Sequence, residues 1–340
     1  MTSKRVGVVI LNWNGRALLE QFLPSVCAHT PTEIADVLVA DNGSTDDSLA
    51  FLQVHYPEVG VIAMPTNTGF AQGYNIALRE LAYEYVVLLN SDVMVSRHWL
   101  EPLVAYADAH PEVAAIQPKI RSLRQDGFFE HAGAAGGFID SLGYAFCRGR
   151  IFATVERDQG QYDCVLPIFW ASGACFFTRL SDYKAAGGLD EHFFAHMEEI
   201  DLCWRYHRMG KEVVCVPESV VKHLGGATLD VENPRKTYLN FRNNLLMLYK
   251  NLPVRGRSTI LFIRQLLDGV AALQFLLTGK WQNVGAIYRA HRDMRKMTLS
   301  IYRLMDDGLP RQKEYEKQVC RVRSIVWKYY LGGKKHFDSL

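Results

Sequence analysis

Polar side chains follow the short apolar runs in the first hundred residues, at the points where each run stops. Asn12 and Asn14 follow VGVVIL, Asp41 follows ADVLVA, and Asp92 comes shortly after YVVLL. A carboxylate at such a position can hold a hard divalent cation together with substrate phosphates. Taken one at a time, each could equally be a turn or a helix cap. Their repetition favours a ligand site at one edge of a sheet.

A third apolar run leads to the segment NTGFAQGYN, residues 67–75. Two glycines at the start of a helix resemble an anion cradle, because backbone N–H groups at a helix N-terminus point at a bound anion. The same glycines could instead permit close helix packing.

A second acidic cluster, Glu198-Glu199-Ile200-Asp201, opens a helical pattern. In a helix Glu198 and Asp201 share one face, and Glu199 is turned by roughly 100° from Glu198. A carboxylate within reach of a substrate hydroxyl can act as a general base. The alternative is a solvated acidic helix start, stabilised by the helix dipole.

The elements that must position these residues alternate between continuous apolar runs and amphipathic stretches. Strands are predicted over Val6–Leu11, Ala35–Ala40, Val59–Met64, Tyr85–Leu89 and Ala114–Gln117, with helices over Ala17–Ala28, Asp47–His55, Ala71–Leu81 and Trp99–Ala109. This alternation predicts a parallel α/β sheet. In such sheets ligands bind beyond the carboxyl ends of the strands, where the polar clusters stand.

The rest of the chain changes character twice. Residues 120–165 are rich in Gly and aromatic residues, which indicates loops or hairpins laid over the sheet. Strands are then predicted over Pro167–Thr178 and Glu212–Val216, on either side of a helix over Glu198–Met209. Beyond residue 230 the pattern is helical and basic, with helices expected over Lys236–Leu252, Ser258–Leu277 and Trp281–Met305.

Taken together, the motifs resemble those of glycosyltransferase family 2. The matching segments are ILNWNG (10–15), DNGSTDDS (41–48), NTGFAQGYN (67–75), LLNSDV (88–93), WASGACFFTR (170–179), GGLDEHFFAHMEEIDLCWR (187–205) and HLGGAT (223–228). The resemblance covers roughly residues 5–230. It implies a GT-A-type α/β fold, with a mainly parallel sheet flanked by helices and a C-terminal helical extension. The segment NPRKTYLNFRNNLLMLYKNLP (233–253) also looks like bacterial members that resemble rhamnosyltransferases.

The resemblance implies a nucleotide-diphosphate sugar as donor and Mg²⁺ or Mn²⁺ as cofactor. Asp41 matches the carboxylate that binds a uracil or thymine base. Asn90 replaces the first acid of the family's DxD pattern, so Asp92 is the main metal ligand, joined by His223. The implied donor-binding residues are Asn12, Asn14, Asp41, Asn67, Gly69, Asn75, Asn90 and Ser91.

The resemblance also implies a catalytic and an acceptor side. Glu199 takes the place of the family's general base, with Glu198 and Asp201 as further catalytic residues. Trp170, Ser172 and Gly173 match the acceptor-binding segment. Trp170 could stack on a sugar face or simply pack in the core.

Acidic and basic residues are distributed unevenly between the two parts of the chain. The chain has 340 residues and a net charge of +2, but residues 1–230 hold 17 basic and 28 acidic residues, whereas residues 231–340 hold 21 and 8. We therefore predict a catalytic domain over 1–230 and a basic helical region over 231–340. Its amphipathic basic helices suit an anionic membrane surface, although a solvated helical cap would look similar.

Several classes of protein are excluded or disfavoured. Seven cysteines without a CxxC pair argue against a zinc site or a disulfide framework and favour a reducing compartment. We expect no signal peptide and no clean transmembrane helix, because Arg264 and Asp268 interrupt the most apolar stretch, Ile260–Leu277. Nucleic acid is not an expected partner, since no recognition motif appears.

These observations predict an inverting, metal-dependent glycosyltransferase that acts on a growing, lipid-linked glycan of the cell envelope. Its expected place is the cytoplasm, at the inner face of a bacterial cytoplasmic membrane. Two alternatives stay open at this point: a sugar nucleotidyltransferase, which needs no acceptor base, and a non-catalytic nucleotide-sugar-binding scaffold, which has no need of the cluster at 198–201.

Overall fold

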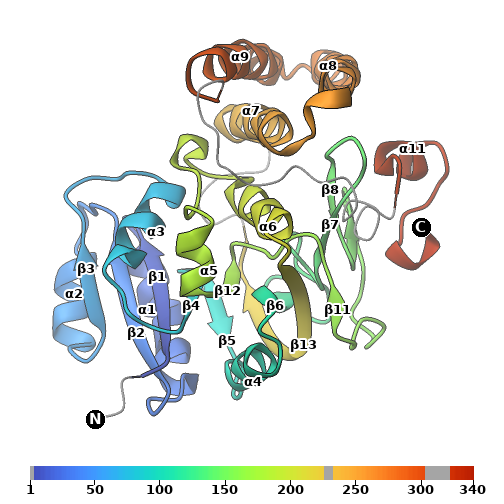
Figure 1. The fold of residues 1–340 in the computed structure, drawn as a ribbon. Helices are drawn as coiled ribbons and strands as arrows, with labels where there is room; N and C mark the ends of the chain where they lie inside the picture. Colours follow the sequence, from blue (N-terminus) through green and yellow to red (C-terminus); the bar gives the residue numbers. More distant parts are fainter. Residues whose placement is uncertain (1–3, 226–232, 303–321) are drawn as a thin grey trace.

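The computed structural model describes residues 4–225, 233–302 and 322–340 (Figure 1). Its central sheet has the strand order β11-β13-β6-β12-β4-β1-β2-β3, and β5 pairs with β13. The strands are β1 (Val6–Asn12), β2 (Ala35–Asp41), β3 (Gly60–Ala63), β4 (Tyr85–Asn90), β5 (Val93–Val95), β6 (Val113–Ser122), β11 (Leu166–Pro167), β12 (Cys175–Arg179) and β13 (Glu212–His223).

The sheet is mixed but mostly parallel. β1 runs parallel to β2 and β4, β2 runs parallel to β3, and β6 runs parallel to β13. β12 lies antiparallel between β4 and β6. The predicted α/β architecture is therefore confirmed, and the carboxyl ends of β1, β2 and β4 meet at one edge.

Successive side chains of each central strand point to opposite faces of the sheet, and they contribute to two hydrophobic cores, one on each face. Val8 and Val87 belong to one core, and Val9 and Val86 to the other. Because both faces are covered, these strands are apolar throughout, as the sequence pattern requires. Helices α1 (Arg16–His29), α2 (Ser48–His55) and α4 (Glu101–Ala109) cover one face; α3 (Phe70–Arg79), α5 (Leu180–Ala185) and α6 (Glu198–Arg208) cover the other.

Two strand predictions differ from the structure. The strand expected over Pro167–Thr178 is divided, because β11 pairs with β13 whereas β12 pairs with β4 and β6, so the chain must cross the sheet between them. β13 extends beyond the predicted Val216 as far as His223, and its last residues pair with β5, which was not predicted.

The hairpins predicted within residues 120–165 form a second, four-stranded sheet. Its order is β10-β9-β8-β7, with β7 (Gly137–Ile139), β8 (Ala145–Cys147), β9 (Arg150–Ile151) and β10 (Thr154–Val155). After α11 (Ile325–Tyr330), the C-terminal end of the chain packs Phe337 against Phe138 and Phe146 of this sheet.

The C-terminal region is helical, as predicted. It contains α7 (Pro234–Asn251), α8 (Val254–Leu277) and α9 (Trp281–Met297), followed by a short π-helical stretch (Thr298–Tyr302). Figure 1 shows the three helices together at the top of the molecule, with α7 next to α6. The predicted end of the last helix at Met305, the domain boundary at residue 230 and the motif residues 226–228 lie outside the described residues.

In helix α8, Arg264 and Asp268 face inward, and several large apolar residues face outward. Arg264 donates from Nη1 to the carbonyl of Leu142 and to Asn244 Oδ1, and Asp268 contacts His291 at 3.0 Å. Both charged side chains are buried. The exposed face consists of Phe262, Ile263, Leu266, Val270, Leu273 and Leu277.

By length and composition α8 could cross a membrane, with a mean hydropathy of 1.7 and 11% of its apolar window buried. This finding differs from the sequence expectation, which counted Arg264 and Asp268 against such a helix. The structure pairs these two residues within the protein, so neither charge lies on the outward face, which is mainly apolar and also exposes Gln265 and Gln274.

Candidate active site

The residues predicted to bind the nucleotide lie where β1 and β2 end. Asn12 and Asp41 are paired in the strand register, and Asn12 Nδ2 donates to Asp41 Oδ2 at 2.9 Å. Asp41 Oδ1 accepts the backbone N–H of Ser44 at 2.9 Å. Asp41 is only 1% exposed, so its carboxylate is fixed before any ligand arrives.

Asn14 joins the first loop to the second. Its backbone has a positive φ of 49°, and its Oδ1 accepts the N–H groups of Thr45 and Asp46 at 2.7 and 3.3 Å. Its neighbour Trp13 is 50% exposed at the same edge. Sequence reasoning assigned Trp13 no role, although an aromatic residue between two strand-end asparagines was a usable signal.

The third loop is held by Asn67 of its own and by Asn42 of the loop after β2. Asn67 Oδ1 accepts the N–H of Gly69 at 2.8 Å, and Asn42 Nδ2 donates to the Gly69 carbonyl at 3.0 Å. Gly69 has φ +87°, and a Cβ there would come within 2.6 Å of the Phe194 ring. Glycine is therefore required for conformation and close packing, which favours that alternative over an anion cradle.

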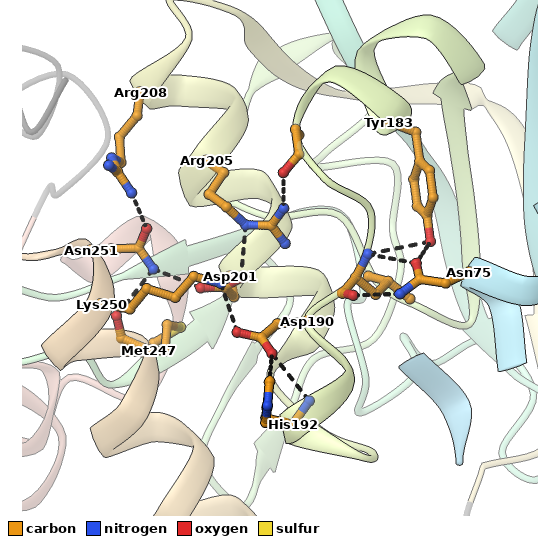
Figure 2. Close-up of polar contacts among 12 residues, drawn as sticks. Asn75, Tyr183, Asp190, His192, Asp201, Arg205, Arg208, Met247, Lys250 and Asn251 are labelled. Carbon is orange, nitrogen blue, oxygen red and sulfur yellow. Dashed lines mark hydrogen bonds and ion pairs between the residues drawn. The ribbon is translucent and has the colours of Figure 1, made fainter. Parts of the chain in front are cut away.

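Asn75 points into the protein rather than toward a ligand. It donates from Nδ2 to the carbonyl of Leu189 at 2.7 Å, and its Oδ1 accepts from Tyr183 Oη and from the Leu189 N–H (Figure 2). Its contacts position the turn that leads to the acidic cluster, so the structure does not bring Asn75 together with the other predicted donor-binding residues.

The predicted metal ligands Asp92 and His223 lie side by side. Asp92 follows β4, and the unpredicted end of β13 brings His223 Nε2 to 3.0 Å from Asp92 Oδ1. His223 Nδ1 lies 3.3 Å from Glu130 Oε2, a carboxylate that sequence reasoning missed. Asn90 and Ser91, half-buried, stand immediately before Asp92.

These contacts set the charge of the cluster. Burial lowers the pKa of His223, but its hydrogen bond to Asp92 and its ion pair with Glu130 outweigh burial and raise that pKa to about 9. Burial raises the pKa of Glu130, yet its contacts with His223 hold it below the usual value. Without a metal ion His223 is therefore a cation between two carboxylates at neutral pH, and its ring must lose this proton before a nitrogen can coordinate a metal.

The residues Asp92 and, once neutral, His223 fit a hard divalent cation that takes further ligands from phosphate groups. Oxygen and imidazole ligands suit Mg²⁺ and Mn²⁺, and Mg²⁺ is usually held by one or two carboxylates plus phosphates. Within residues 4–225, 233–302 and 322–340, no group of three His, Cys, Asp or Glu side chains could hold a metal ion by itself.

Glu198 and Glu199 open α6 after a backbone of unusual conformation. Met197, the residue before the helix, has φ +74°. In the described part of the chain, Glu198 Oε2 and Glu199 Oε2 are buried without a hydrogen-bond partner. Burial raises the pKa of Glu199 to about 7, and burial together with Glu199 raises that of Glu198 well above its usual value.

Asp201 has a different environment from the two glutamates. Its carboxylate accepts from Arg205 Nε at 2.9 Å, Lys250 Nζ at 2.8 Å and Asn251 Nδ2 at 2.7 Å (Figure 2). It is fully buried, and its charge is balanced by Arg205 and Lys250. This arrangement leaves Asp201 suited to holding α6 against α7.

Of the three predicted acceptor-binding residues, Gly173 is the one that lies beside the acidic cluster. A Cβ on Gly173 would lie 4.0 Å from Glu199 Cδ. Ser172 is buried; its Oγ donates to the Ala132 carbonyl, and its N–H donates to Gln117 Oε1. Trp170 is 4% exposed and donates from Nε1 to the Phe138 carbonyl. The structure thus favours core packing over sugar stacking for Trp170.

Comparison with known proteins identifies the family to which the chain belongs. The sequence model of the family described as Glycosyl transferase family 2 matches residues 7–177. The chain therefore belongs to glycosyltransferase family 2, and it is a glycosyltransferase of this family.

Two curated relatives are rhamnosyltransferases. The N-acetylglucosaminyl-diphospho-decaprenol L-rhamnosyltransferase of Mycobacterium tuberculosis (strain H37Rv) is 29% identical over 233 residues, which cover 64% of this chain and 75% of that protein. The rhamnosyltransferase WbbL of Escherichia coli (strain K12) is 26% identical over 194 residues, covering 53% and 69% of the two chains.

Solved structures confirm the GT-A fold. TarS of S. aureus in complex with UDP-GlcNAc has a TM-score of 0.57 and 17% identity, covering 85% of this chain and 80% of that chain. The mannosyltransferase PcManGT from Pyrobaculum calidifontis, in complex with GDP-Man and Mn²⁺, has a TM-score of 0.52 and 16% identity, covering 88% and 76%.

Proposed function

We propose that this enzyme transfers a sugar, with inversion, from a nucleotide-diphosphate sugar to a hydroxyl of a lipid-linked glycan in cell-envelope polysaccharide synthesis. The observation that carries the proposal is Glu199, whose buried, unpartnered Oε2 lies beside Gly173 with a pKa raised to about 7. A base of this pKa is matched to neutral pH. A sugar nucleotidyltransferase or a binding scaffold has no use for such a group.

The proposed step is a single displacement. The acceptor hydroxyl gives its proton to Glu199 Oε2 while its oxygen forms a bond to the anomeric carbon. The bond from that carbon to the diphosphate breaks, and the nucleoside diphosphate leaves from the opposite face. The transition state has oxocarbenium character, as in other glycosyl chemistry, and Glu198 adds a second buried carboxyl beside the base.

On the donor side we propose that Asp41 accepts the N–H of a uracil or thymine base. Its oxygens already accept from Asn12 and Ser44, and a carboxylate has about four lone-pair sites, so capacity remains. The exposed Trp13 is placed to stack on the base. Asn14 and Asn67 keep the surrounding loops in position. UDP- and dTDP-linked sugars both suit this site.

Asp92 and His223 are the proposed ligands of Mg²⁺ or Mn²⁺, with Asn90 and Ser91 beside them. When bound, the ion offsets charge on the departing diphosphate. Glu130 holds His223 from the other ring nitrogen, which fixes the ring beside Asp92. We propose that Asp201 and Asn75 position the catalytic segment and do not touch substrate.

The acceptor proposal rests on the relatives and on α8. One relative acts on a diphospho-decaprenol-linked sugar, as its name states. The exposed apolar face of α8 would lie in the interface of an anionic bilayer, and the exposed basic residues Arg289, Arg292, Arg295 and Lys296 of α9 would face lipid headgroups. The proposed location is the cytoplasmic face of the bacterial inner membrane.

Transfer from a labelled donor tests the proposal. The full chain is incubated with UDP- and dTDP-linked sugars, dTDP-rhamnose first, and a polyprenyl-diphosphate-linked N-acetylglucosamine in vesicles, with and without Mn²⁺. Product whose new glycosidic bond has the opposite anomeric configuration to the donor supports it. Pyrophosphate release from a nucleoside triphosphate and a sugar phosphate would support a nucleotidyltransferase, and donor binding without turnover would support a scaffold.

A further inference from the structure

The segment of residues 192–197, which leads into Glu198 and Glu199, has an unusual backbone. Phe194, His196 and Met197 have φ values of 66°, 71° and 74°. Residues with side chains rarely adopt such angles, and strained positions persist only where the surrounding structure holds them. Something must therefore hold this segment in place.

One side chain of α7 meets the segment at three points. Asn243, which is fully buried, approaches with its Nδ2 the carbonyls of Phe193 at 2.9 Å, Ala195 at 2.8 Å and His196 at 2.7 Å. Its Oδ1 accepts from Arg242 Nε at 2.9 Å. An amide has two N–H hydrogens, so three carbonyls share them, and no other side-chain type of this size offers the same pattern.

Arg242 strengthens this contact from the neighbouring position. Its Nη2 donates to the carbonyls of His192 and Phe193, each at 3.0 Å. On the opposite side, the Phe194 carbonyl accepts the N–H of Phe70 at 2.7 Å, at the start of α3. The segment thus connects the helix beside the donor loops with the helix that carries the carboxylates.

Two turns further along α7, a second contact fixes α6 itself. Lys250 Nζ contacts Asp190 Oδ2 at 2.9 Å and Asp201 Oδ2 at 2.8 Å, and Asn251 donates to Asp201 Oδ1 (Figure 2). Residues 243 and 250 lie on one face of a helix because seven residues make nearly two turns. α7 therefore holds the catalytic segment before Glu198 and again after Glu199.

We infer that Asn243 is a positioning residue for the catalytic carboxylates. It acts through the backbone of residues 193–196, which fixes where α6 begins and hence where Glu199 lies relative to Gly173. The inference rests on the proposed function of Glu199. It gives a role to the segment at 233–253, which the donor and acceptor sites leave unexplained.

The test compares Asn243→Ala with Asn283→Ala in the full chain. Asn283 is a second buried amide, and it donates to Thr237 Oγ1 at 2.8 Å, joining α9 to α7. For each variant we would measure kcat, the KM of donor and acceptor, donor affinity, the melting temperature and hydrogen exchange of residues 190–200.

Asn243→Ala should lower kcat by at least about tenfold, because small misplacements of reacting groups are costly. Donor affinity should stay within about twofold, and exchange of residues 190–200 should become faster. Asn283→Ala should lower the melting temperature with wild-type kcat and unchanged exchange in this segment. If Asn243→Ala does not fold, Asn243→Ser, which keeps one donor, should give an intermediate kcat.

Two results would overturn the inference: wild-type kcat in Asn243→Ala, or an equal loss of kcat in Asn283→Ala at the same melting temperature. Hydrogen exchange distinguishes a failure of this inference from a failure of the proposed function. If the wild-type enzyme transfers no sugar, the proposed function fails, whereas faster exchange at residues 190–200 in Asn243→Ala would still support the positioning contact and unchanged exchange would refute it.

Discussion

At the scale of single residues, the two glutamates of the acidic cluster differ from Asp201 in what surrounds them. Glu199→Gln keeps the shape of the side chain and removes its basicity. We expect the transfer rate to fall by roughly 10²–10⁴-fold, as is typical for loss of a general base, with donor affinity unchanged. Transfer assays and donor titration measure both quantities.

Glu198→Gln and Asp201→Asn are the controls for this experiment. Glu198→Gln should cost less activity, and Asp201→Asn should lower the melting temperature because it weakens the contacts with Arg205 and Lys250. Near wild-type transfer by Glu199→Gln, with either control inactive, would move the base to another residue of the cluster.

The pKa of Glu199 also predicts pH dependence. Burial raises it to about 7, so the base is protonated at lower pH, and kcat should rise with pH up to a plateau above about 7. A pH–rate profile with its acid limb near pH 5 would contradict this prediction.

The same shift has an opposite consequence for stability. Between the unfolded value of 4.5 and about 7 the folded state binds more protons, so stability falls as pH rises through this window. Glu199→Gln should therefore raise the melting temperature more at pH 8 than at pH 5. Thermal unfolding of the wild type and the variant at both pH values measures the difference.

Asp92 gives the metal prediction. Asp92→Ala should abolish Mn²⁺-dependent donor binding and turnover, because Asp92 is the carboxylate of the Asn90–Asp92 triplet. Calorimetric titration of donor with and without Mn²⁺ reads out binding independently of turnover. Full activity of chelator-treated wild-type enzyme would show that no metal is needed.

The sequence predicts the position of residues at strand ends better than the direction of residues within loops and helices. Asp41, Asn12 and Asp92 stand at strand ends, so strand prediction alone places them at one edge. Asn75 and Trp170 fall in matching motifs, but their direction depends on partners more than 30 residues away. Glu130 lies in the hairpin region, where no periodicity indicates that it meets His223.

At the scale of elements, the periodicity of apolar residues predicts the strands and helices of the α/β half. Each of these elements is apolar on the faces that it buries. The sequence does not predict that the strand expected at 167–178 is divided. A continuous apolar run has the same pattern in a strand and in a buried connection between two strands. Which face α8 turns outward was not visible either, because it depends on Asn244 and His291 pairing with its charged residues.

The orientation of α8 changes the expected chemistry of membrane contact. A triple variant in which Leu266, Val270 and Leu273 are each replaced by Ser should co-sediment less with anionic vesicles. Its transfer rate to a water-soluble acceptor analogue should be unchanged. Replacing Arg289, Arg292 and Arg295 with Gln is the matched control, and it should reduce binding mainly at low salt. Unaltered sedimentation of the Ser variant would rule out contact through this face.

At the scale of the whole molecule, the acidic and basic halves of the sequence do not act as separate units. α7 belongs by charge to the basic region, yet Asn243, Lys250 and Asn251 contact the catalytic half. The chain from Phe337 likewise packs on the second sheet. Composition shows where charge changes along the chain, whereas packing decides which segments work together.

The outward face of α8 also bears on how reaction rates should be expressed. An enzyme resting on a bilayer meets a lipid-linked acceptor by lateral diffusion in two dimensions. Turnover then follows the mole fraction of acceptor among the lipids rather than its molarity in the suspension. For the proposed membrane-bound enzyme, adding inert phospholipid would slow the reaction by surface dilution, although the bulk concentrations of enzyme, donor and acceptor stay the same.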